Sequence, residues 1–172
     1  MKKFNFYDFK MPMLIHEVSL NLDTDIKRNI ENFLLHHKDE MNHTTNVKAN
    51  RTKWTTHKTN KDIFALSEMV LKIANDIMAL PLYTAECWGA TYSNGHKAIQ
   101  HNHFPFLWSW CYYVKTPIGS SPLVFPDSNI IFEPKEDEVI IFPSLCDHFV
   151  PPCTCEEKRI MVAGNIGLER IN

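Results

Sequence analysis

The chain has 172 residues, of which 44% are hydrophobic and 12% aromatic, a composition that excludes a disordered protein and predicts one domain with a real core. Its formal net charge of −2 offers no basic field for nucleic acid or an anionic membrane. No apolar run approaches the roughly 20 residues that cross a bilayer, no signal peptide is visible, and five cysteines without CxxC spacing favour a reduced, cytoplasmic protein.

The N-terminal part predicts a strand followed by a helix. Residues 11–20 are β-prone, and Pro12 places this strand at a sheet edge because proline cannot donate a ladder hydrogen bond. Asp23 or Thr24 can cap the helix that follows. Its apolar positions fall at helical spacing, at Ile26, Ile30, Phe33 and Leu34.

A polar stretch separates this helix from a second one. Residues 41–60 have no apolar period, which predicts a long loop or a flap over a site, with Trp54 as an anchor to the core or a substrate contact. The second helix is capped by Asn60 and stopped by Pro81. Its apolar stripe, from Ile63 through Leu66, Met69 or Val70, Ile73 and Ile77 to Leu80, predicts core packing.

From residue 82 the chain changes to short β runs separated by turn signals. The expected strands are 84–93, 107–115, 122–125, 130–132, 138–142 and 159–166. Many short strands after two helices predict a mainly β protein, a jelly roll or cupin-like barrel with both N-terminal helices packed on its outer face. We expect one domain over 1–172, in which 1–81 is the supporting part and 82–172 the barrel.

Three histidines stand where these short strands begin or end. His101 and His103 are two residues apart on an extended segment, so their side chains point the same way. His148 follows the apolar run 139–143 and can close the face of a metal ion. The pattern predicts a metal site built from these three imidazoles.

The order of the motifs resembles the iron(II)/2-oxoglutarate-dependent oxygenases, most of all small bacterial and phage members and, more distantly, prolyl-hydroxylase-type enzymes. It is carried by His101-Asn102-His103, a strand ending Tyr112-Tyr113-Val114, Phe142-Pro143-Ser144 before His148, and Arg159. The resemblance implies a double-stranded β-helix, Fe(II) on His101 and His148, and 2-oxoglutarate held at its far carboxylate by Arg159 and Tyr113, with help from Tyr92. Catalysis would need no residues beyond the metal ligands.

His103 departs from the family's pattern, which has Asp or Glu at this place. Neutral imidazole would leave the metal more positive than the usual two-histidine, one-carboxylate face. Asp127 could supply a carboxylate from another strand, although a turn role after Pro126 is the more common one. Asp147 could orient a ligand ring or simply face water.

Two further readings stay open. Gly95, five residues, His101, one residue and His103 also fit a cupin motif, so a three-histidine dioxygenase without 2-oxoglutarate is an alternative. A non-enzymatic metal- or carbohydrate-binding barrel is another. The main interpretation implies hydroxylation of an unidentified small-molecule or peptidyl substrate, with succinate and carbon dioxide as co-products. It implies no nucleic-acid or membrane partner, and it allows a homodimer.

Overall fold

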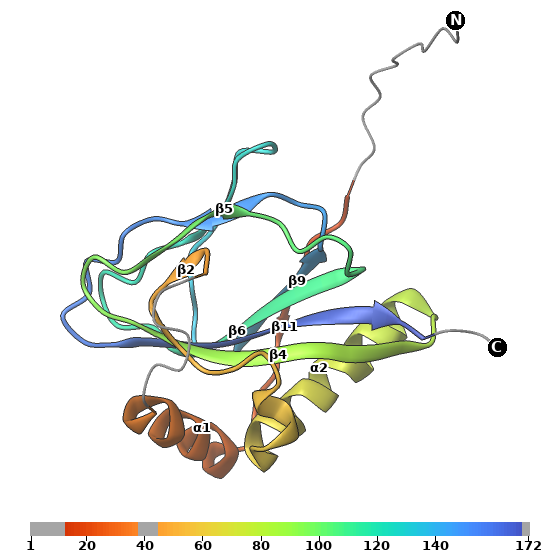
Figure 1. Ribbon diagram of the computed structural model, residues 1–172, viewed down its shortest axis with the longest axis horizontal. Helices are drawn as coiled ribbons and strands as arrows, with labels where there is room; N and C mark the ends of the chain where they lie inside the picture. Colours follow the sequence, from red (N-terminus) through yellow and green to blue (C-terminus); the bar gives the residue numbers. More distant parts are fainter. Residues whose placement is uncertain (1–12, 38–44, 170–172) are drawn as a thin grey trace, which may run out of the picture.

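Two antiparallel sheets and two helices make up the computed structural model, which describes residues 13–37 and 45–169 (Figure 1). The six-stranded sheet runs in the order β1 (His16–Ser19), β9 (Glu138–Pro143), β6 (Trp108–Lys115), β11 (Arg159–Leu168), β4 (Leu82–Tyr92) and β3 (Asn50–Arg51). The five-stranded sheet runs β2 (Val47–Lys48), β5 (Lys97–His101), β10 (His148–Val150), β7 (Leu123–Phe125) and β8 (Ile130–Phe132). The protein is therefore mainly β with two helices, as predicted.

Both helices lie on the outer face of the six-stranded sheet (Figure 1). Helix α1 (Thr24–His36) begins at Asp23, whose carboxylate accepts the backbone N–H groups of Asp25 and Ile26 at 2.9 and 3.2 Å. Helix α2 (Lys61–Met78) is capped in the same way by Asn60. Both predicted caps are confirmed, and no helix within the described residues is long and apolar enough to cross a membrane.

Side chains that alternate along the strands of the six-stranded sheet pack into two different hydrophobic cores, one on each face of the sheet. On β6, Trp110 and Tyr112 pack toward the helices, whereas Cys111 and Tyr113 pack between the two sheets. On β11, the interior set begins with Arg159 and continues with two small or flexible side chains, Met161 and Ala163. The inward-facing residues of these central strands therefore line the space where the candidate site lies.

The polar stretch 41–60 is the main departure from the predicted fold. Residues 41–44 lie outside the described part, but the rest holds strands β2 and β3 and the 3-10 helix η1 (Thr56–Lys58). Thr52 exchanges hydrogen bonds with the Gly89 backbone at 3.1 and 3.0 Å, and its hydroxyl accepts from Thr56 at 2.7 Å. A polar sequence can be buried here because its hydroxyl groups are paired, so the expected long loop instead contains short regular elements, although part of it does line a cavity.

Three smaller predictions need correction. The first strand spans only His16–Ser19 at the predicted sheet edge, and residues 11 and 12 lie outside the described part. On α2 Val70 is buried whereas Met69 and Ile77 are exposed, and Leu80, also exposed, lies beyond the end of the helix at Met78. Cys153 and Cys155, expected to be reduced, form a disulfide.

Gly164 is where β11 passes closest to its neighbours, and it yields a stability prediction. An added Cβ would lie 2.7 Å from both the Glu86 carbonyl oxygen and the buried Trp110 ring. Because a backbone oxygen cannot swing away as a side chain can, we expect Gly164→Ala to lower the free energy of unfolding by about 1–3 kcal/mol. Chemical denaturation measures this change, and a midpoint equal to that of the wild type would contradict it.

Candidate metal centre and anion pocket

The structure brings the three predicted histidines together. His101 ends β5 and His148 begins β10, and the two are register partners across these antiparallel strands. His103 follows two residues after His101. One ring nitrogen from each of the three lies within 4.8 Å of the others, and the ring centroids are 4.5–5.0 Å apart. Within residues 13–37 and 45–169, this is the group of side chains suited to hold a metal ion.

A bulge in β5 aims His101 inward. His148 pairs with His101 and Val150 with Ala98, so β5 contains one more residue than β10 over this interval. Ala98 and His101 consequently both line the inner cavity although they are three residues apart. Regular strand alternation would place one of them on the opposite face.

Backbone hydrogen bonds orient two of the imidazoles. The Nδ1 of His101 donates to the Ile99 carbonyl oxygen at 2.6 Å, and the Nδ1 of His148 donates to the Cys146 carbonyl oxygen at 2.9 Å. Since a carbonyl can only accept, both rings carry their proton on Nδ1 and present the Nε2 lone pair. His103 is held through its backbone, whose N–H donates to Ser144 at 2.8 Å.

All three imidazoles are neutral at physiological pH. Burial, and then the neighbouring histidines, lower the pKa of His103 to about 2. Burial and His101 lower the pKa of His148 to about 4, and burial also lowers the pKa of His101. Neutral imidazole is the form that binds a metal, so protons compete weakly for these ligands.

Arg159 supplies a buried positive charge to the same cavity as the histidines. Its side chain is 1% exposed, and its guanidinium carbon lies 4.7 Å from the ring centroid of Tyr92 and 5.4 Å from that of Tyr113. Its Nε and Nη1 atoms have no hydrogen-bond partner, and no ion pair of Arg159 occurs within the described residues. A buried cation without a carboxylate partner is costly, so the charge of Arg159 favours an anionic ligand at this end of the cavity.

The two tyrosines predicted from the family resemblance both lie beside Arg159. Tyr92 is its register partner on β4, and Tyr113 faces it from β6. Burial raises the pKa of both phenols, so each remains a neutral hydroxyl beside the guanidinium. Tyr113 also accepts a hydrogen bond from the Cys111 thiol at 3.5 Å. Cys111 was not predicted, although its period-two spacing from Tyr113 could have found it.

Two cavities meet at the histidines. The inner one is narrow, about 50 Å³, and joins the three histidines to Arg159 and Tyr92 between the sheets. The outer one, about 200 Å³, shares His101, His103 and Trp88 with it and is walled by Trp54 and residues 45–47. A metal at the histidines would therefore stand between an anion pocket and a wider, uncharged cleft.

The segment that holds Trp54 also contributes Arg51, which the sequence analysis missed. The Arg51 guanidinium carbon lies 3.3 Å from the centroid of the Trp54 ring, and Trp54 meets Trp88 edge to face at 4.5 Å. Trp88 in turn lies 6.0 Å from His103. No spacing signal in the sequence marks Arg51, because its contact with the Trp54 ring is visible only in the folded structure.

Neither aspartate considered as a metal ligand joins the cluster. Asp127 is exposed in the turn after β7, where the Asn129 N–H donates to Pro126 at 3.3 Å, so the turn role fits. The Asp147 carboxylate accepts hydrogen bonds from the side-chain amides of Gln100 and Asn102 at 3.1 and 2.8 Å. These two bonds hold the pKa of Asp147 below its usual range.

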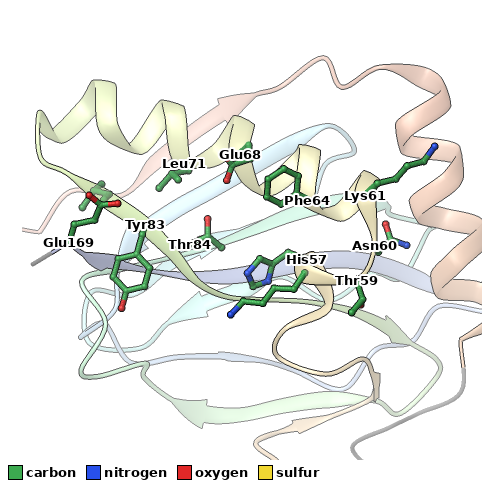
Figure 2. Close-up of a pocket in the computed structure, with 12 residues that line it drawn as sticks. His57, Thr59, Asn60, Lys61, Phe64, Glu68, Leu71, Tyr83, Thr84 and Glu169 are labelled. Carbon is green, nitrogen blue, oxygen red and sulfur yellow. The ribbon is translucent and has the colours of Figure 1, made fainter.

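A separate groove of about 560 Å³ lies on the other side of the six-stranded sheet, between α2 and the start of β4. Figure 2 shows Phe64, Leu71 and Tyr83 along it, with His57 beneath. It shares no lining residue with either cavity at the histidines. This groove therefore takes no part in the candidate metal centre.

The fold is similar to that of solved enzymes that bind 2-oxoglutarate or hydroxylate prolyl residues. No family model and no curated protein matches the sequence, so the similarity is one of structure. The viral collagen prolyl hydroxylase of Paramecium Bursaria Chlorella virus-1, solved with 2-oxoglutarate, superposes with a TM-score of 0.71 at 15% identity, covering 88% of this chain and 94% of that one.

Two other solved structures have the same fold. HygX from Streptomyces hygroscopicus, with nickel, 2-oxoglutarate and hygromycin B bound, has a TM-score of 0.70 at 10% identity and covers 92% of this chain and 84% of its own. A Pseudomonas putida prolyl-4-hydroxylase has a TM-score of 0.66 at 17% identity, with 91% and 93% covered. The resemblance seen in the sequence is thus confirmed for the fold, which does not by itself assign residue roles or substrate.

Proposed function

We propose that this protein is an Fe(II)- and 2-oxoglutarate-dependent dioxygenase that hydroxylates a substrate and releases succinate and carbon dioxide. The observation that carries the proposal is the buried guanidinium of Arg159, which has no carboxylate partner within the described residues and lies in the cavity that also holds His101, His103 and His148. A cation at one end and metal ligands at the other suit a small dicarboxylate that spans both.

The residues present fit this cofactor and cosubstrate. His101, His103 and His148 would hold Fe(II), since neutral imidazoles suit this metal. Arg159 would bind the far carboxylate of 2-oxoglutarate, which meets the hydrogen-bonding need of its Nε and Nη1 atoms. Tyr92 would complete this end of the pocket, and Tyr113, which does not line the cavity, would contact the Arg159 guanidinium. When bound, Fe(II) supplies the activation of dioxygen that couples decarboxylation of 2-oxoglutarate to oxidation of a C–H bond.

The chain itself contributes orientation and a dry site. The walls of the inner cavity are mainly apolar, with Val47, Leu123, Phe142 and Met161 among them, so bulk water is kept from the cosubstrate. The outer cleft lies on the other side of His101 and His103 and would admit the substrate. We propose a small-molecule or peptidyl substrate and no nucleic-acid partner. A homodimer would be compatible with this function.

We also propose that strands β4 to β11 form the double-stranded β-helix of these oxygenases. The strand orders β9-β6-β11-β4 and β5-β10-β7-β8 support it, since from β4 to β11 the chain passes from one sheet to the other at every step except the β7–β8 hairpin. In that arrangement β5 and β10, which carry His101 and His148 side by side in one sheet, face β11 of the other sheet, which carries Arg159.

Binding of 2-oxoglutarate tests the proposal. In anaerobic calorimetry, we expect the Fe(II)- or Ni(II)-loaded protein to bind 2-oxoglutarate, and succinate to bind more weakly because it lacks the keto group that contacts the metal. Metal binding without any 2-oxoglutarate binding would favour a three-histidine cupin-type dioxygenase. Absence of metal binding would leave a non-enzymatic barrel, and neither alternative accounts for the unpaired Arg159.

A further inference from the structure

We propose that Asp147 is a positioning residue that holds all three candidate metal ligands in place from the outer face of the sheet. This inference rests on the proposed metal site and deepens it. Asp147 immediately precedes His148, and its two carboxylate oxygens are both engaged: Oδ2 accepts from Gln100 at 3.1 Å and Oδ1 from Asn102 at 2.8 Å.

Gln100 and Asn102 are the two residues that flank His101. Because neighbouring side chains on an extended chain point to opposite sides, neither amide lines the inner cavity, which the His101 ring does line, and Asn102 instead lines the outer cleft. The carboxylate therefore fastens β5 to β10 at the register pair of His101 and His148. This pair lies beside the β5 bulge, where the ladder between the two strands is interrupted.

Asn102 extends the brace to the third ligand. While its Nδ2 donates to Asp147, its Oδ1 accepts the backbone N–H of Phe104 at 3.2 Å. His103 lies between these two residues and makes its own backbone bond to Ser144 at 2.8 Å. The turn that carries His103 is thus tied, through one amide, to the carboxylate beside His148.

The size of the expected effects separates positioning from general stability. The bonds of Asp147 lie at the protein surface, where water competes for both partners, so their loss should shift the melting temperature by only a few degrees. A metal site requires its ligands to be held within about 0.5 Å, and loss of an outer partner typically lowers metal affinity roughly 10–100-fold. Removal of Asp147 should therefore change metal binding far more than the melting temperature.

Cobalt(II) titration of Asp147→Asn and Asp147→Ala tests this role, because the visible spectrum of bound Co(II) reports ligand geometry. We expect affinity to fall roughly 10–100-fold with a changed spectrum, while the metal-free protein melts within a few degrees of the wild type. Asp127→Asn is the matched control: it removes the same charge from a nearby turn without touching β5, and should bind Co(II) like the wild type. Wild-type affinity and spectrum in both Asp147 variants would overturn the proposal.

A reversed pair provides a rescue. In the double variant Asp147→Asn/Asn102→Asp the hydrogen-bond donor and acceptor exchange places. The carboxylate introduced at position 102 can still accept a hydrogen bond from the Phe104 N–H. The affinity for Co(II) should therefore recover at least partly. If Asp147→Asn also lowers the melting temperature of the metal-free protein, this double variant decides: recovered Co(II) affinity supports positioning, and unrecovered affinity rejects it. A wild type that binds no Co(II) would instead refute the proposed metal site itself.

Discussion

Replacing Arg159 with methionine should strongly weaken 2-oxoglutarate binding and leave the metal-free protein as stable as the wild type or more so. A charge-assisted carboxylate pair in a buried site typically contributes about 2–5 kcal/mol, so affinity should fall roughly 30-fold to several thousand-fold. Methionine matches much of the arginine volume and removes a cation that has no partner carboxylate within the described residues. Exchange of buried charge for an apolar side chain is often neutral or stabilising by about 1–4 kcal/mol.

Two measurements separate the binding role of Arg159 from a structural one. Calorimetry with Ni(II)-loaded protein gives the 2-oxoglutarate affinity, and thermal unfolding of the metal-free protein gives stability. Arg28→Met, which removes an exposed arginine from α1, is the control and should leave both quantities unchanged. Retained 2-oxoglutarate affinity in Arg159→Met, or a marked loss of stability with no loss of affinity, would contradict the anchoring role.

The helices and the long strands were predictable because their signals are local. Asp23 and Asn60 cap helices through their own next residues, and apolar periodicity over 8–11 residues suffices to find β4 and β6. The strands β5 and β10, which carry two of the candidate ligands, were not among the predicted runs. β10 has only three residues, and β5 contains a bulge that breaks its alternation, so neither has a readable period.

The candidate site was found from the sequence by another route. Histidine and arginine carry chemistry that can be recognised one residue at a time, and their order along the chain resembles a known family. The contacts that could not be predicted are those between residues far apart in the sequence. Arg51 is buried where β3 pairs with the distant strand β4, and Asp147 meets Gln100 and Asn102 only after two short strands pair.

His103 is the position where this chain departs from the two-histidine, one-carboxylate pattern, and its variants should separate a true ligand from a bystander. Its ring centroid lies 4.9 Å from that of His101 and 5.0 Å from that of His148, and the group of candidate ligands contains no carboxylate. Loss of a residue that only orients a metal ligand typically lowers metal affinity by up to about 100-fold. If all three imidazoles bind the metal, His103→Ala removes a ligand itself and should lower Fe(II) affinity by at least that much.

His103→Asp should behave in the opposite way. An aspartate here would restore the carboxylate of the two-histidine, one-carboxylate pattern, so Fe(II) binding and 2-oxoglutarate turnover should be kept or increased.

In the metal-free protein the same carboxylate would be buried beside Trp88 without a cation, which should raise its pKa and lower stability. Metal binding must then displace a proton from the introduced carboxyl group, whereas the neutral imidazole of His103 has none to release near pH 7. Calorimetry in buffers of different ionisation enthalpy measures this proton release. Equal Fe(II) affinity in wild type, His103→Ala and His103→Asp would show that His103 stands beside a two-histidine site without binding the metal.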